Sequence, residues 1–304
     1  MSRRGWIMFI TMGVIWGVPY LMIKVAVGDG ALTPAALVFL RTGVAAVLLL
    51  PVAAARGQLR PLLPRWRPLL AYTVAELAVP WLLLSNAERH ITSSLAGLLL
   101  AAVPLVGALL ATLTGAERLG PRRLVGLLVG LAGVAALVGI DFTGSSAAAL
   151  IQMAVVAIGY ALGPFILVRY MSDLPSLGVV AASLGLGALG YLPVGLMQLP
   201  RHLPRPTVLA SVLGLAVLCT AVAFLVFFAL IDEVGPVRAT VITYINPAVA
   251  VALGVLFLHE PLTVGIGVGF VLILAGSVLA TRRTPTRSTA PTPAEPVPAT
   301  VGEP

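Results

Sequence analysis

Residues 96–133 read AGLLLAAVPLVGALLATLTGAERLGPRRLVGLLVGLAG, and residues 239–276 read ATVITYINPAVAVALGVLFLHEPLTVGIGVGFVLILAG. At an offset of 143, these stretches align without a gap, and twelve of the 38 aligned positions are identical. The identities include a proline, an acid and a glycine: Pro104 with Pro247, Glu117 with Glu260, and Gly126 with Gly269. Chance repetition of Ala and Leu does not easily supply these three together. An internal repeat in a membrane chain is typical of a transporter whose binding site lies where the halves meet.

The composition identifies a membrane chain. Of its 304 residues, 59% are hydrophobic and 10% are charged, whereas a soluble domain has about 25% charged residues. A bilayer span requires about 20 mostly apolar residues. Ten segments meet this requirement: 6–27, 34–55, 68–87, 92–115, 121–140, 146–170, 175–199, 207–231, 236–258 and 262–281. The sequence therefore predicts an all-α integral membrane fold with ten transmembrane helices and no soluble domain.

The distribution of basic residues predicts the orientation. With the N-terminus placed in the cytoplasm, the inside segments hold fourteen Arg residues and the outside loops hold four Lys or Arg residues. This positive-inside bias predicts a multi-pass protein of the cell (inner or plasma) membrane with both termini cytoplasmic. The net charge of +8 is thereby explained by orientation in the bilayer, and we expect no nucleic-acid partner.

The ten spans divide into two sets of five. We expect repeats at residues 1–141 and 142–283, followed by a disordered cytoplasmic tail at 284–304 that is rich in Pro, Thr and Ala. An odd number of spans makes the second copy enter the membrane from the opposite side. The two five-helix repeats are therefore predicted to be inverted relative to each other.

The repeated residues resemble a known family. Residues 87–94, Pro104, residues 115–119, Gly126 and Gly133 resemble the EamA repeat of the drug/metabolite transporter superfamily, and residues 230–276 resemble it again. The resemblance implies a ten-helix inverted-repeat carrier of small metabolites such as amino acids, often working outward. Arg41 fits the family pattern. Glu76 departs from it, and neither residue has a charged counterpart in the second half, where the offset gives Ser183 and Cys219.

Two charged residues lie within predicted spans, where a charge is costly and persists only if something compensates for it. Arg41 is a candidate for holding a substrate carboxylate or phosphate. Glu76 is a candidate for binding a substrate amine or the proton that couples transport. An alternative is a structural ion pair between Arg41 and Glu76 that faces the bundle interior.

Further candidates for substrate contact are aromatic or amide side chains inside spans: Trp16, Tyr20, Tyr160, Tyr244 and Asn246. A mid-membrane amide is costly unless it is hydrogen-bonded, so Asn246 is expected to face a neighbouring helix or a cavity. The alternative for each of these residues is ordinary helix packing. Trp81 lies nearer the outer side and is interpreted as an interface anchor.

Other repeated residues are interpreted as structural or hinge positions: Pro19, Pro104, Glu117, Pro164, Pro247 and Glu260. The prolines remove backbone hydrogen bonds and kink helices. The two acids precede predicted helices, and a carboxylate there interacts favourably with free N–H groups at the positive helix end. Glycines in spans five and ten favour close packing of these helices, either within one chain or between two chains of a homodimer.

The sequence contains no catalytic constellation. The one cysteine, Cys219, is interpreted as a packing residue, and no metal-binding or nucleotide-binding motif is present. We therefore predict a secondary active transporter, not an enzyme, with no cofactor or metal. Its partners would be a small-molecule substrate, the lipid bilayer and a coupling proton. The alternative function is a membrane scaffold or sensor that does not transport.

Overall fold

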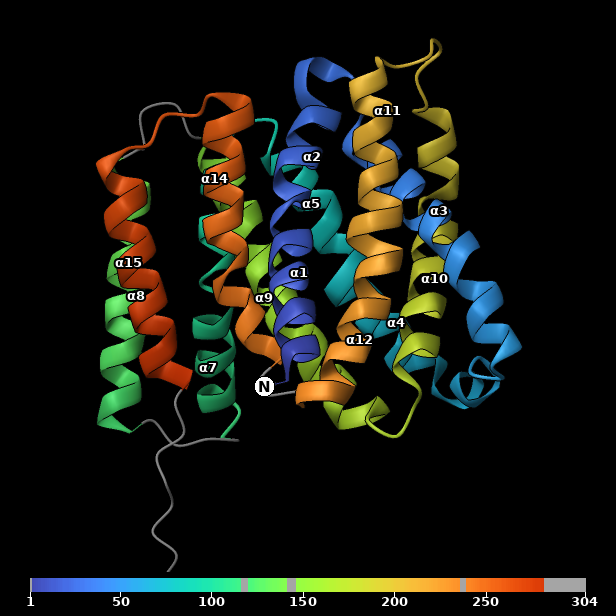
Figure 1. Cartoon of the computed structure of the whole chain (residues 1–304), viewed down its shortest axis with the longest axis horizontal. Helices are drawn as coiled ribbons and strands as arrows, with labels where there is room; N and C mark the ends of the chain where they lie inside the picture. The colour runs from blue at the N-terminus through green and yellow to red at the C-terminus, as the bar shows by residue number, and fades with distance from the viewer. Residues whose placement is uncertain (1, 116–119, 141–145, 236–238, 282–304) are drawn as a thin grey trace, which may run out of the picture.

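The computed structural model describes residues 2–115, 120–140, 146–235 and 239–281, and within these ranges the chain is helical without strands. Figure 1 shows the helices packed side by side as a bundle, with most of their axes roughly aligned. Glu117 and the tail at 284–304 lie outside the described residues. The prediction of an all-α membrane fold is confirmed.

Short connections join the consecutive helices. In chain order they are α1 (Arg3–Gly17), α2 (Pro19–Val27), η1 (Gly28–Gly30), α3 (Pro34–Ala55), η2 (Arg60–Arg65), α4 (Trp66–Tyr72), η3 (Thr73–Ala78), α5 (Val79–Ala87), α6 (Ser93–Leu100), α7 (Val103–Leu113), α8 (Pro121–Ile140), α9 (Ala147–Met171), α10 (Ser176–Met197), α11 (Pro206–Leu213), η4 (Gly214–Val222), α12 (Ala223–Val234), η5 (Thr240–Tyr244), α14 (Asn246–Leu258) and α15 (Val264–Thr281).

Within the described residues, nine helical stretches are long and apolar enough to cross a membrane. Several of them combine consecutive elements, such as Arg60–Ala87 and Pro206–Val234. A tenth apolar helix, Ile242–Leu258, is shorter. Each of the nine overlaps one predicted span, and the shorter helix overlaps the remaining one. We call the end of the bundle that is predicted to face outside the outer end.

Two helix pairs form opposite edges of the bundle. α15 packs along α8 at one edge, and α10 packs along α3 at the other. Each pair joins a helix from the first half of the chain to one from the second half. The helices α1, α9 and α14 lie between the two edges (Figure 1). The interior of the bundle is therefore lined by helices from both halves.

The close packing of α8 against α15 depends on glycines, which have no side chain. A Cβ atom at Gly276 would lie 2.5 Å from the Cα of Gly130 and 2.7 Å from the carbonyl oxygen of Gly126. A Cβ at Gly133 would lie 2.7 Å from the backbone nitrogen of Ile273. The two backbones thus touch directly, as small residues permit in membrane helices. Of the two pairings predicted from the glycines, the structure shows the one within a chain.

The repeated prolines Pro104 and Pro247 occupy the same kind of position. Pro104 is in the first turn of α7, after the break at residues 101–102, and Pro247 is in the first turn of α14, after η5. A proline is tolerated there because its missing N–H would have no intrahelical partner. Both prolines therefore lie at the start of a helix that follows a local break in the span.

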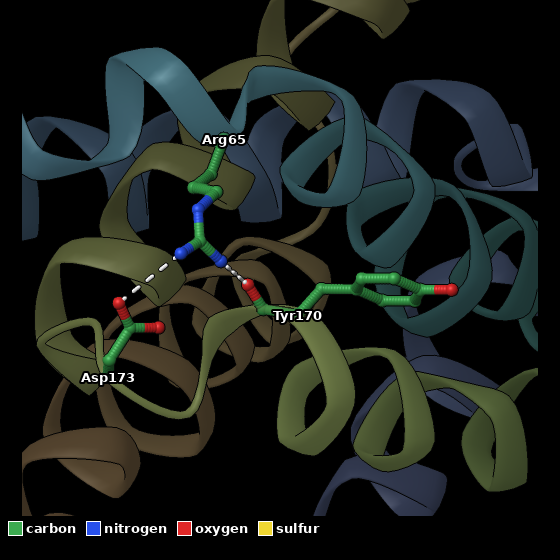
Figure 2. A network of polar contacts seen from close by, with 3 residues as sticks. All are labelled: Arg65, Tyr170 and Asp173. Carbon is green, nitrogen blue, oxygen red and sulfur yellow. Dashed lines mark hydrogen bonds and ion pairs between the residues drawn. The ribbon is translucent and has the colours of Figure 1, made fainter.

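At the inner end of the bundle, opposite the outer end, an exposed contact joins the two halves of the chain. Arg65 in η2 donates to the backbone carbonyl of Tyr170 and forms a salt bridge with Asp173, with 3.4 Å between Nη2 and Oδ2 (Figure 2). The side chains of Arg65 and Asp173 are 43% and 64% exposed. Because exposed ion pairs contribute about 0–1 kcal/mol, this contact holds the halves together only weakly.

Candidate functional site

A set of polar and aromatic side chains gathers in the interior, contributed by helices from both halves. We call it the central cluster, and its members are Tyr20 of α2, Arg41 of α3, Trp81 of α5, Tyr160 of α9 and Thr220 of η4. Arg41, Trp81 and Thr220 are 7%, 5% and 0% exposed. Polar groups buried this deeply in an apolar bundle require partners.

The Arg41 guanidinium contacts two side chains, one through its Nε–H group and the other through the face of its plane. Its Nε donates to Thr220 Oγ1 at 3.0 Å, and its Cζ lies 3.6 Å from the centroid of the Trp81 ring. The ring offers cation–π stabilisation, which is strongest for tryptophan. Within the described chain, no carboxylate lies within salt-bridge distance of Arg41, and the ion pair found there is that of Arg65 with Asp173. Among the described residues, Arg41 is therefore a buried guanidinium without an anionic partner.

The position of Thr220 depends on a π-helical segment. Thr220 Oγ1 donates to the Leu215 carbonyl at 2.7 Å, five residues earlier, within η4. The wider turn of a π-helix lets this carbonyl accept the hydroxyl proton, which leaves the hydroxyl oxygen free to accept from Arg41. Such segments are often found at functional sites.

A second π-helical segment, η3 (Thr73–Ala78), lies in the third span and carries Glu76. At the repeat offset of 143, Glu76 corresponds to Cys219, which lies in η4. The two π-helices therefore occupy corresponding places in the two halves. One presents a carboxyl group and the other presents Thr220 beside a buried thiol.

The two tyrosines of the central cluster flank Arg41. Tyr160 lies beside Trp81 and within electrostatic range of Arg41. Tyr20 also lies within electrostatic range of Arg41 and Tyr160. Tyr20 packs against α6 at Gly97, where an added Cβ would lie 3.5 Å from the tyrosine ring. The structure thus brings together three of the predicted contact residues: Tyr20, Arg41 and Tyr160.

Glu76 packs against α9 at Gly163, one turn along this helix from Tyr160. Its Oε2 atom is buried and has no hydrogen-bond partner in the described chain. Gly163 makes the space for this carboxyl group, since a Cβ there would lie 2.8 Å from Glu76 Cδ. The alternative of an ion pair between Arg41 and Glu76 is wrong, because the cation binds Thr220 and Trp81 instead.

Two of the remaining predicted contact residues, Trp16 and Tyr244, make contacts of other kinds. Trp16 packs against Phe224 and Phe227 of α12, with ring centroids 5.9 and 4.7 Å away. The Tyr244 hydroxyl shares an exposed hydrogen bond of 3.2 Å with Thr281 Oγ1. These contacts match the packing alternative for both residues.

Asn246 also serves helix packing. In the amide orientation that satisfies its surroundings, Nδ2 donates to the carbonyls of Ile242 and Gly13 at 3.0 and 3.1 Å. The amide thus joins the start of α14 to α1. This meets the expectation that it faces a neighbouring helix, and it removes Asn246 from the central cluster.

The structure corrects the interpretation of Trp81. Instead of anchoring the chain at the membrane surface, its ring is buried beneath the Arg41 guanidinium. Thr220 was not identified from the sequence at all. A threonine inside an apolar span carries no signal of its own, and only its place one residue after the counterpart of Glu76 pointed to it.

Glu260 joins the halves at the outer end of the bundle. Its carboxylate accepts hydrogen bonds from the backbone N–H groups of Ser93 and Ser94 at 2.7 and 2.9 Å, and from the Ser94 hydroxyl at 2.5 Å. The sequence predicted that Glu260 caps the helix that follows it. Instead it caps α6 of the other half, while Thr263 caps α15 through its bond from the Ile266 N–H.

Replacement of Glu260 by alanine is expected to destabilise the protein. The change removes three hydrogen bonds to a buried carboxylate, and hydrogen bonds to charged groups contribute about 1.5–3 kcal/mol each. The measurement is the thermal unfolding midpoint of purified protein in detergent. Arg65→Ala is the control, since it also breaks a contact between the halves, but an exposed one. An equal effect of both variants would contradict the assignment of Glu260.

Comparison with known proteins finds related sequences and a related fold. The sequence model of the EamA-like transporter family matches residues 3–139 and 147–282. An uncharacterized transporter, YvbV, of Bacillus subtilis strain 168 is 24% identical over 88% of this chain and 88% of its own length. The uncharacterized inner membrane transporter YedA of Escherichia coli K12 is 30% identical over 79% of this chain and 78% of its own. A solved crystal structure aligns with a TM-score of 0.65 and 21% identity, covering 92% of this chain and 97% of the other.

Proposed function

Since this chain belongs to the EamA-like transporter family and is a multi-pass membrane transporter of the drug/metabolite type, we propose that it is a secondary active transporter. Its substrates are small metabolites that carry a carboxylate, such as amino acids, and it exports them. The substrate binds at the central cluster, between two inverted five-helix repeats. Alternating access then exposes this site to each side of the membrane in turn.

The observation that supports this function best is the unpaired cation of Arg41. A buried guanidinium offers five N–H donors in a planar fork that matches a carboxylate, and only its Nε has a partner in the described chain. A substrate carboxylate would supply both the missing charge and the missing acceptors. The family's metabolite substrates include compounds with this group.

The surroundings of Arg41 favour a substrate that also has an apolar part. Trp81 covers one face of the guanidinium, and the rings of Tyr20 and Tyr160 lie nearby. Aromatic side chains offer apolar faces, while the tyrosine hydroxyls offer hydrogen bonds. This combination suits an amphipathic metabolite.

The placement of the cluster supports alternating access. Arg41 belongs to the first half and its partner Thr220 to the second, so relative motion of the halves changes this contact. The spans that contain Pro104 and Pro247 are interrupted in the middle, and interrupted helices are typical of transporters in which repeats move. No nucleotide-binding element was found in the sequence, so the proposed energy source is a substrate or proton gradient.

The experiment that tests this function is transport by purified protein in proteoliposomes. A panel of labelled amino acids and related small carboxylates would be screened for uptake and for counterflow. We expect at least one carboxylate to exchange and uncharged analogues to fail. Silence across the panel, from protein shown to be folded, would favour the scaffold or sensor instead.

Glu76 is proposed as the group that couples transport to protons. Glu76→Gln is expected to abolish accumulation driven by a pH gradient while counterflow of the same substrate continues, because exchange does not require net proton movement. Asp173→Asn is the control, since it neutralises an exposed acid at the inner end. Unchanged gradient-driven accumulation in Glu76→Gln would remove Glu76 from this role.

A further inference from the structure

A second buried carboxyl group lies at the outer end of the central cluster. Glu88 is in the turn between α5 and α6, outside the spanning helices, and its side chain is 0% exposed. Neither of its carboxylate oxygens makes a hydrogen bond of ordinary geometry in the described chain. An ionised carboxylate buried without hydrogen bonds is costly, whereas the protonated form is much less so.

Lys24 of α2 lies beside this carboxyl group but binds elsewhere. Its Nζ donates to the backbone carbonyls of Glu88 and Ile91 at 2.6 and 2.8 Å. The ammonium group therefore holds the end of the first span against the turn of residues 88–91. An ionised Glu88 would be a stronger acceptor than either carbonyl, so the charge of Glu88 sets where Lys24 binds.

Other charged groups around Glu88 are already engaged. The Glu260 carboxylate, from the loop before α15, is bound to the N-terminus of α6. Arg41, from α3, is stacked on Trp81. The hydroxyl groups that lie within electrostatic range of Glu88 belong to Tyr20 and Tyr160. Lys24 is thus the one partner in this set that a small movement could bring to the carboxylate.

A cavity at the outer end of the bundle reaches Lys24. It has a volume of about 510 Å³ and opens at the outer end between the first span and α11. Its polar lining residues are Lys24, Asp29, His202, Arg205 and Thr207. Lys24 lines this cavity and also binds the turn of residues 88–91, so it connects the cavity to the turn that carries Glu88, which does not itself line the cavity.

We propose that Glu88 is a proton-binding site at the outer end, and that its protonation controls the Lys24 contact between the first span and the turn of residues 88–91. A proton from water in the cavity forms an O–H bond on a Glu88 carboxylate oxygen, and Lys24 then stays on the two carbonyls. When the proton returns to water, the carboxylate attracts the ammonium away from them. If the Lys24 contact closes the outer end during transport, protonation of Glu88 makes this closure sensitive to pH. This part of the proposal rests on the proposed transport function.

The electrostatics of the site agree with this assignment. Burial raises the pKa of Glu88 well above its ordinary value; the Lys24 ammonium lowers this pKa, the Glu260 carboxylate raises it, and Arg41 lowers it. Since the folded protein holds this proton more tightly than the unfolded chain, its stability falls as pH rises from the unfolded pKa of about 4.3 to the folded value.

The test is infrared spectroscopy of the protein in lipid nanodiscs, titrated from about pH 5 to about pH 9. Wild-type protein should show a protonated-carboxyl band that disappears as pH rises and is missing in Glu88→Gln. Asp29→Asn, which neutralises an exposed acid in the same cavity, should keep the band. Lys24→Met should move the midpoint of the titration to higher pH, because a positive charge beside the carboxyl is lost.

Two outcomes would overturn the proposal: a Glu88→Gln spectrum that retains every titrating band of the wild type, or a midpoint that does not move in Lys24→Met. If Glu88→Gln does not fold, the Lys24→Met titration and the pH dependence of wild-type thermal stability still test whether Glu88 binds the proton. Wild-type stability that does not fall with rising pH in this range counts against the site. Since these measurements need no substrate, they can fail while the transport assay succeeds, and the reverse.

Discussion

Replacement of Arg41 by methionine is expected to reduce transport of carboxylate substrates by at least about 30-fold. Loss of one partner from a buried charge pair costs about 2 kcal/mol or more, because the substrate carboxylate would enter an apolar site without its counter-charge. Methionine keeps an apolar stem of similar length against Trp81. Arg41→Lys is expected to recover only part of the activity, since an ammonium lacks the planar fork that binds a carboxylate through two bonds.

The measurement is initial uptake in proteoliposomes for whichever carboxylate the panel identifies. Arg67→Met is a matched control, because Arg67 also lies over a tryptophan, Trp66, at 5.3 Å, but on the exposed surface of the protein. The control should transport like the wild type. Normal uptake of carboxylates by Arg41→Met would mean that the substrate does not bind through this cation.

Replacement of Gly276 by leucine is expected to prevent α8 and α15 from packing. Even the first carbon of a side chain would lie 2.5 Å from the Cα of Gly130, and this atom belongs to a backbone that cannot rotate away. Inserting one methyl group into a tightly packed interior costs about 1–3 kcal/mol, and leucine adds three further carbons. We expect Gly276→Ala to lower the thermal unfolding midpoint and Gly276→Leu to yield little folded protein.

Gly267 on the same helix provides the control, because a Cβ there would meet nothing within 4 Å. Gly267→Ala and Gly267→Leu should both fold, with midpoints equal to or above that of the wild type. The yields would be measured by size-exclusion chromatography and the midpoints by thermal unfolding in the same detergent. Tolerance of leucine at position 276 would show that the two helices can separate without loss of the fold.

The sequence predicted the spans well because length and hydropathy are local properties. All ten predicted segments correspond to apolar helices, although the helix near Pro247 is shorter than expected in the described chain. Arg41, Tyr20 and Tyr160 were identified because a charge or a polar ring within an apolar span is conspicuous. Their grouping could not be derived, since it depends on how α2, α3 and α9 face one another.

Residues without a local signal were missed or misassigned. Thr220 is an unremarkable residue in its span, and the π-helical segment that turns it toward Arg41 has no clear signature in the sequence. Trp81 was placed at the membrane surface because of its distance from the helix end. Distance along the helix says nothing of the direction in which a side chain points, and Trp81 points inward.

Neither Lys24 nor Glu88 was singled out as a site residue from the sequence. The burial of Glu88 and the position of Lys24 follow from contacts between residues 64 and 67 positions apart in the chain. No periodicity within either segment predicts such contacts. Glu260 does act as a structural capping residue, but the helix was misassigned in the same way, since the nearest helix in the sequence is not the helix that its carboxylate caps.

The bond from Ser93 to Glu260 spans 167 residues, and this separation has a consequence for biosynthesis. Helices enter the membrane in the order of their synthesis. The N–H groups of Ser93 and Ser94 at the start of α6 are therefore bound to water until the ribosome has synthesised the chain as far as Glu260. The first five spans are therefore an unfinished intermediate. A nascent chain halted before residue 260 should expose this helix end to proteases and chaperones on the far side of the membrane.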